Sequence, residues 1–192
     1  MNFVNIVIFI LAASSYVVGF LEIVQNKYRP SLFTRTILIM IAINGFVALQ
    51  IGSAAASAIA LGWAYLIGNI LIWVGSIWRG DYTFRKTEIF SVALLALSGI
   101  IWLVADAPLI NLILSIIANS AGLLPTYRRV LLDPKSESSN FWLLFFFASL
   151  LSLFVISDWR LISVLMPIYF CFTDGSLFLL SKRRLVLKND KA

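Results

Sequence analysis

Long stretches without a charged side chain constrain this chain more than any other feature. Residues 36–78 contain no Asp, Glu, Lys or Arg, and as one helix they would extend about 64 Å at about 1.5 Å per residue. The hydrocarbon core of a bilayer is about 30 Å thick, and a helix crosses it with about 20 mostly apolar residues. The stretch therefore predicts two membrane spans joined by a tight turn near Gly52, where small residues suit a reversal.

Composition supports a lipid environment and an all-helical fold. Hydrophobic residues make up 61% of the chain and charged residues 12%, compared with roughly 45–50% and 25% in soluble globular proteins. Backbone groups in hydrocarbon must pair internally, and the apolar runs are too long and too uniform for barrel strands. We therefore expect an all-α membrane protein with seven transmembrane helices. The other five apolar runs are 2–21, 89–105, 107–127, 138–157 and 161–181.

The basic residues predict the orientation of these helices. Seven spans place the two termini on opposite sides of the membrane. All 15 Lys and Arg residues except Arg160 then fall on one side, and such residues favour the cytoplasmic side. We expect the N-terminus outside, the C-terminus in the cytoplasm and the chain in the cell membrane. The net charge of +6 is then a topology signal and needs no nucleic-acid partner.

The two halves of the chain match weakly at an offset near 104 residues. The matched pairs are Pro30 with Pro134, Tyr65 with Tyr169, and Arg79 with Arg183. Hydrophobic helices can also align by chance, but a steady offset favours an internal repeat. It predicts a 3+1+3 arrangement, in which helix 4 links two parallel three-helix repeats. The expected divisions are a first repeat over 1–80 with helices at about 3–24, 36–51 and 57–78, linker helix 4 within 81–105, a second repeat over 106–184 with helices at about 107–127, 139–157 and 161–181, and a cytoplasmic tail over 185–192.

Two consecutive segments carry a resemblance to a known superfamily. Ala121–Tyr127 has a proline near the end of its predicted helix, and Asp133–Ser138 follows with a Lys-Ser element. They resemble the PQ-loop segment of the SWEET and PQ-loop transporters, and most closely that of uncharacterised prokaryotic seven-helix members. The likeness covers nearly all of the chain, although Thr126 replaces the family Gln and Glu22 stands where the first repeat would match Pro125. It implies the 3+1+3 fold, an outside N-terminus and a sugar bound between Asn residues of helices 3 and 7.

Polar side chains at membrane depth are costly unless they are paired or face a cavity, so they are candidates for a binding site. The third predicted helix carries three candidates on one face at four-residue spacing: Tyr65, Asn69 and Trp73. The seventh carries Tyr169, Thr173 and Asp174. Asn69 fits the sugar-binding position that the resemblance implies, and its counterpart is Thr173 or Asp174. The alternative is that these groups only join neighbouring helices.

Asp174 is also the candidate for proton coupling, because a carboxyl without a partner in the membrane favours its protonated form. The alternative is that Asp174 lies close enough to Lys182 and Arg183, near the membrane surface, to be hydrated. Asn119, which aligns with Tyr16, and Asn44 are further binding candidates. Pro125 and Pro167 remove backbone donors inside helices 5 and 7 and are candidates for gating hinges.

The sequence offers no enzyme chemistry. There is no histidine and one cysteine, Cys171, so a histidine metal site, a histidine-based triad and an internal disulfide are excluded. No phosphate-binding loop or carboxylate cluster suggests a cofactor or a metal. We therefore expect a carrier that moves a small polar solute, with a sugar as one candidate, by alternating access between helices 3 and 7. A proton-coupled carrier that uses Asp174 and a non-transporting membrane subunit remain open, as does self-association into a homo-oligomer.

Overall fold

The structure is a computed structural model of the chain. It describes residues 2–27, 29–83, 89–90, 92–93, 95–97, 100 and 107–189. The side chains of residues 135 and 184–189 lie outside this description.

All named secondary-structure elements among the described residues are helices. They are α1 (Phe3–Val24), α2 (Leu32–Ile51), α3 (Ala56–Arg79), α5 (Pro108–Leu132), α6 (Ser139–Phe154) and α7 (Leu161–Asn189), with a short 3₁₀ helix, η1, over Pro134–Ser136. Five helices of the described chain are long and apolar enough to cross a membrane: α1, α2, α3, α5 and, over 161–183, α7. α6 is a shorter apolar helix. The prediction of an all-α, multi-pass membrane protein is confirmed in this form.

Several helices extend past the limits that their charged residues set in the sequence. α2 begins at Leu32 and includes Arg35, because the Ser31 hydroxyl accepts a hydrogen bond from the Thr34 N–H at 3.3 Å and caps the first turn. α5 continues from its predicted end at 127 to Leu132. Long basic side chains can extend from a helix end towards water, so a charge does not end a membrane helix. The predicted helix over 89–105 lies largely outside the described residues, although those described between 89 and 100 are helical.

The molecule is apolar outside and carries polar groups inside. Large apolar side chains are exposed along the helices, for example Ile10 of α1, Val74 of α3 and Phe172 of α7. Polar side chains such as Asn69 and Asn111 are almost fully buried. This distribution suits a lipid solvent, in which an apolar surface carries no penalty and buried polar groups join helices.

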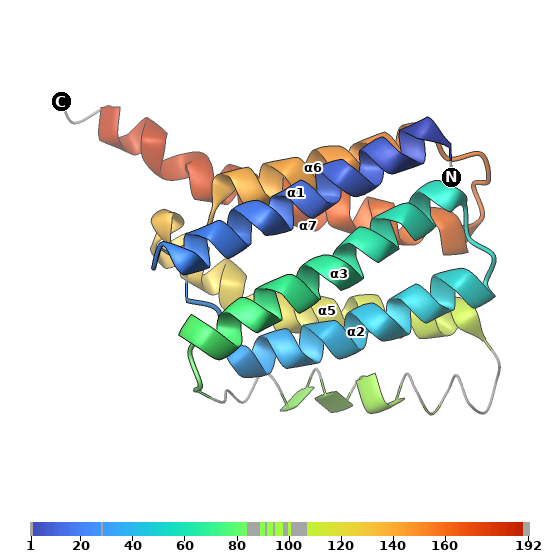
Figure 1. The fold of residues 1–192 in the computed structure, drawn as a ribbon, viewed down its shortest axis with the longest axis horizontal. Coiled ribbons are helices and arrows are strands. Elements are labelled where there is room, and N and C mark those ends of the chain that lie inside the picture. Colours follow the sequence, from blue (N-terminus) through green and yellow to red (C-terminus); the bar gives the residue numbers. More distant parts are fainter. Residues whose placement is uncertain are drawn as a thin grey trace.

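The described helices pack as a closed ring. α3 lies between α1 and α2, and α7 lies between α5 and α6. The ring closes where α1 packs against α6 and where α2 packs against α5 (Figure 1). The interior of this ring therefore faces all of the described helices.

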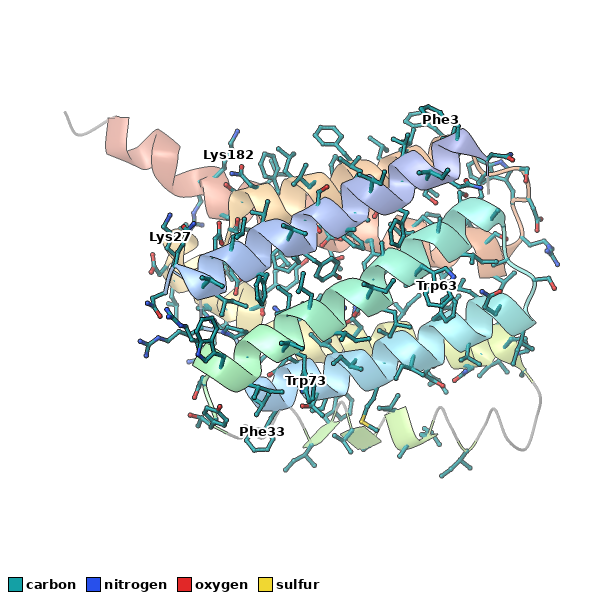
Figure 2. The ribbon with its side chains drawn as sticks, in the orientation of Figure 1. Phe3, Lys27, Phe33, Trp63, Trp73 and Lys182 are labelled. Carbon is teal, nitrogen blue, oxygen red and sulfur yellow. The ribbon has the colours of Figure 1, made fainter. Side chains whose placement is uncertain are left out.

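The two ends of the bundle differ in charge. Figure 2 shows Lys27 and Lys182 at one end, which we call the basic end, and Phe3 at the other, which we call the opposite end. At the basic end, the backbone of Asp81 pairs with that of Pro30 and Leu32 at 2.9 Å, which joins the α1–α2 loop to the segment after α3. At the opposite end are the α2–α3 turn and the α6–α7 turn.

Candidate functional site

Three polar residues lie at the same depth in the bundle. Tyr16 in α1, Asn69 in α3 and Asp174 in α7 are each the same number of residues from the helix end at the opposite end. This distance is about 20 Å along each axis at about 1.5 Å per residue. All three side chains are buried. Helix packing therefore gathers them at one level inside the ring.

A hydrogen-bond network crosses the bundle at this level. The Asn69 side-chain amide donates to the Tyr16 hydroxyl at 3.3 Å and to the Tyr65 carbonyl at 2.8 Å. The Tyr65 hydroxyl donates to Asn119 Oδ1 at 3.0 Å, and the Asn119 amide donates to the Tyr169 hydroxyl at 3.2 Å. The network connects α1, α3, α5 and α7, so it joins the first half of the chain to the second.

A glycine positions Tyr16 in this network. A Cβ atom built at Gly68 would overlap the Tyr16 ring, which packs directly on the α3 backbone. The same ring makes edge contacts with Phe141 and Phe145 of α6, at centroid distances of 5.2 and 5.5 Å. Small residues allow such close approach in membrane helix pairs. The absence of a side chain at Gly68 therefore brings the Tyr16 hydroxyl within reach of Asn69.

A small cavity, which we call the central cavity, lies beside these residues. Its volume is about 30 Å³, which is room for about two water molecules, since one needs about 10–15 Å³ on this measure. Aromatic rings form much of its wall, together with polar side chains from five helices. The polar and charged lining comprises Tyr16, Arg35, Tyr65, Asn69, Asn119, Thr173 and Asp174, and the aromatic lining adds Phe141, Trp142, Phe145 and Phe170.

Two polar atoms of this lining lack a hydrogen-bond partner among the described residues. One is Asp174 Oδ2, on a residue that is 4% exposed, and the other is Trp142 Nε1 on α6. Leaving a buried acceptor or donor unpaired costs about 1–3 kcal/mol, and more for a charged group. Both residues belong to the lining of the central cavity, so a solute that binds there lies close to an unpartnered acceptor and an unpartnered donor.

Two further cavities adjoin the central one along the bundle. A cavity of about 20 Å³ shares Tyr65, Asn119 and Phe170 with it and continues towards the opposite end. A cavity of about 10 Å³, which we call the basic-end cavity, shares Arg35 and Phe141 with it. None of the three is large enough for a sugar. Side chains therefore divide this part of the interior into small spaces.

Direct contacts between the two halves close the opposite end. The Arg160 guanidinium donates to the Ser53 carbonyl at 2.7 Å. The Ala55 N–H donates to the Ser163 hydroxyl at 2.8 Å, and the Ser57 hydroxyl donates to the Ser152 carbonyl at 3.2 Å. The α2–α3 turn and the α6–α7 turn are thus joined above the cavities.

Not all residues that the sequence singled out meet at the central cavity. Tyr65, Asn69, Asn119, Thr173 and Asp174 do. Tyr169 lines the adjoining cavity towards the opposite end and reaches the network through Asn119.

Two candidates lie elsewhere. The half-buried Trp73 donates its indole N–H to the Thr36 hydroxyl at 2.9 Å (Figure 2). The Asn44 amide donates to Asn111 and Ser115 at 2.8 Å each, between α2 and α5. A four-residue step advances a helix by 400°, so Trp73 is rotated by about 80° from Tyr65 over two steps. This drift turns Trp73 away from the cavity.

Pro125 and Pro167 lie inside α5 and α7. Each removes one backbone hydrogen bond from its helix.

The sequence analysis missed three lining residues that carry polar side-chain atoms. Arg35 was counted only among the basic residues that predict topology, Trp142 was not singled out, and Tyr16 entered only as the aligned partner of Asn119. The depth of Tyr16 within its helix is a signal that could have identified it, because it equals that of Asn69.

Comparisons with known proteins add no assignment. No protein-family model, curated protein or solved structure matches the chain. Among the described residues, no group of His, Cys, Asp and Glu side chains is arranged to hold a metal ion.

Proposed function

We propose that this protein is a membrane carrier for a small polar solute, which binds in the central cavity between α3 and α7. The observation that carries the proposal is that Asn69, Thr173 and Asp174 line one cavity, and that two of its lining residues, Asp174 and Trp142, each carry a buried polar atom without a hydrogen-bond partner among the described residues. Polar groups at membrane depth commonly mark a solute pathway. If these polar groups only joined neighbouring helices, they would not need to line the same cavity.

The proposed architecture is seven helices in a 3+1+3 arrangement, with the N-terminus outside and the basic end in the cytoplasm. The helix order supports it, because the third helix lies between the first and second in both halves. Matched arginines give further support. Arg79 donates to the Val24 carbonyl at 2.8 Å, and Arg183 donates to the Leu131 carbonyl at 3.3 Å. Each joins the end of its repeat's third helix to the end of the first.

The chemistry of the cavity limits the solute. Asp174 Oδ2 accepts a hydrogen bond and Trp142 Nε1 donates one, so the solute should offer both a donor and an acceptor. Aromatic walls suit the apolar faces of a sugar ring or a similar compact molecule. A volume of about 30 Å³ excludes such a solute from the closed conformation. Transport therefore requires the two halves to separate at one end at a time, with Pro125 and Pro167 as the proposed hinges.

Proton coupling is a second candidate for the mechanism. Asp174 is buried, and among the described residues no basic side chain lies within salt-bridge distance of it. A carboxyl in that setting can bind and release a proton during transport. A carrier of this kind would move solute in response to a pH gradient.

Flux of labelled monosaccharides and other small polar solutes into proteoliposomes tests the proposal. We expect wild-type protein to mediate saturable flux, and Asn69→Ala and Asp174→Asn to reduce it at least tenfold. Asn44→Ala is the matched control, because it removes a membrane-embedded amide outside the central cavity, and it should retain most of the flux. Equal flux in all four proteins would contradict the proposed solute site at Asn69 and Asp174. The absence of flux with any solute would favour a non-transporting subunit. Flux that ignores an imposed pH gradient would remove proton coupling.

A further inference from the structure

A buried carboxylate lies at the basic end of the interior, in the loop that the sequence resemblance singled out. Glu137 follows η1, and its side chain is 4% exposed. The segment is fixed on both sides. The Ser136 hydroxyl donates to the Asp133 carbonyl at 2.6 Å, and the Ser138 hydroxyl accepts from the Phe141 N–H at 3.3 Å to cap α6. The backbone between α5 and α6 therefore directs Glu137 into the bundle and away from water.

Glu137 is poorly compensated for a buried charge. Its Oε1 lies 3.7 Å from Arg129 Nη1 of α5, which is an ion pair without a hydrogen bond, and the same oxygen has no hydrogen-bond partner among the described residues. The basic-end cavity beside it has a volume of about 10 Å³, so it holds at most about one water molecule. A buried carboxylate needs both a close partner and hydrogen bonds to offset its lost hydration.

The charged groups around Glu137 come from both halves of the chain. Glu22 of α1 and Arg35 of α2 line the basic-end cavity with it, and Arg129 approaches from α5. α7 also packs against η1; there, Lys182 lies over the Phe178 ring and Arg183 donates to the Leu131 carbonyl. Burial raises the pKa of Glu137 to about 7, with Arg129 and Arg35 opposing the rise and Glu22 adding to it. Protonated and ionised Glu137 are therefore about equally populated in this structure near neutral pH, where an ordinary carboxyl would be ionised.

We propose that Glu137 is a proton-binding site that controls access to the central cavity from the basic end: protonated Glu137 keeps that end closed, and its deprotonation opens it. The ionised carboxylate gains hydration only if α1, α2 and the α5–α6 loop separate enough to admit water. Arg35 and Phe141 line both the basic-end cavity and the central cavity, so water that enters at Glu137 reaches the solute site. This inference deepens the carrier proposal and rests on it, and it assigns the pH response to Glu137 in addition to Asp174.

Chemical labelling of a cysteine in the central cavity tests access without using flux. In a Cys171→Ser background, Leu123→Cys places a thiol in the lining. Its reaction with a membrane-impermeant methanethiosulfonate reagent is followed from pH 5 to pH 8, in vesicles that expose either end of the protein. At each pH, the labelling rate of Leu123→Cys is divided by the labelling rate of Leu123→Cys combined with Glu137→Gln. Ionisation of the thiol affects both rates equally, so it cancels in this ratio.

We expect the ratio to be lowest at pH 5, to rise at least tenfold by pH 8 and to flatten above pH 7, only in vesicles that expose the basic end. Linkage between an ordinary carboxyl at 4.5 and one at about 7 allows at most a rise of about 300-fold. Asp158→Asn, which removes a partly exposed carboxylate at the opposite end, should leave the pH dependence unchanged. If Glu137→Gln does not fold, the parent probe is compared with Leu132→Cys, which is 78% exposed.

A ratio that stays flat from pH 5 to pH 8 would overturn the role of Glu137. So would a pH response that survives in Glu137→Gln, because the titrating group would then lie elsewhere. The carrier proposal fails differently, through absence of flux in a protein whose cavity still becomes accessible.

Discussion

At the scale of single residues, two carboxylates differ from all the others described. Asp174 and Glu137 are both buried, and each keeps an oxygen without a hydrogen-bond partner among the described residues. Asp158 shows the ordinary case, since it is partly exposed and the hydrogen bond from Arg160 lowers its pKa. Retaining a buried, poorly paired carboxyl costs stability. In the proposals above, Asp174 contacts the solute and Glu137 responds to pH.

Glu137→Gln should stabilise the protein at alkaline pH. The pKa of Glu137 is raised by burial from 4.5 to about 7, so the folded state holds its proton more tightly than the unfolded state. The resulting penalty is absent below about pH 4.5, grows between pH 4.5 and 7, and is constant above pH 7. Removing the charge should add about 1–3 kcal/mol to the free energy of unfolding at pH 8 and almost nothing at pH 4.5.

Thermal unfolding in detergent measures this effect as a rise in Tm. Asp158→Asn is the control, because the Asp158 carboxylate is partly exposed and its pKa is shifted in the other direction. A gain that is the same at pH 4.5 and pH 8 would show that ionisation of Glu137 is not its cause.

At the scale of elements, helix positions followed from the sequence better than helix ends did. α1 and α3 begin and end within a residue of their predicted limits, because a membrane span is selected by local hydropathy. The ends of α2 and α5 were placed short, because Arg35, Arg128 and Arg129 are helical despite their charge. Capping and tertiary contacts at the basic end decide those last turns, and charge spacing carries no information about them.

Ser163→Ala should loosen the junction of the two turns at the opposite end. The Ser163 hydroxyl is fully buried and accepts the hydrogen bond of the Ala55 N–H at 2.8 Å. Its loss leaves a buried donor unpaired, which should lower the free energy of unfolding by about 1–3 kcal/mol.

Ser14→Ala is the matched control. Its hydroxyl bonds only the carbonyl four residues earlier in its own helix, at the surface of the bundle, so a change below about 0.5 kcal/mol is expected. Denaturation monitored by tryptophan fluorescence compares the two variants. Equal losses would contradict a special role for the turn junction.

At the scale of the whole molecule, the ring of helices converts an ordered series of spans into one interior. The closing contacts, α1 with α6 and α2 with α5, join segments far apart in the sequence. The hydrogen bonds of Arg160 and Ser163 hold the opposite end together. Glu22, Arg35, Arg129 and Glu137 gather at the basic end. The two ends of the proposed pathway therefore differ in chemistry: hydrogen bonds join the turns at the opposite end, and partly buried charged residues surround the buried Glu137 at the basic end.

Cysteine labelling in intact cells should establish the orientation. In the Cys171→Ser background, Asp158→Cys at the opposite end should react with an impermeant reagent from outside if the basic end faces the cytoplasm as proposed. Leu132→Cys should react only after the cells are opened. The reverse pattern would contradict the proposed orientation but would leave the cavity and its residues unchanged.

The sequence by itself determined that the chain is a bundle of apolar helices, where most of those helices lie, and that its basic residues gather at one end. These properties depend on the transfer of each local segment from water to lipid, which local composition controls. Only the tertiary structure decided which polar side chains meet. It turned Trp73 outwards, brought Trp142 and Tyr16 to the central cavity, and buried Glu137 between the two halves. Each of those outcomes depends on neighbours from distant parts of the chain, such as Gly68 beneath Tyr16 and Arg35 beside Glu137, whose approach no local pattern records.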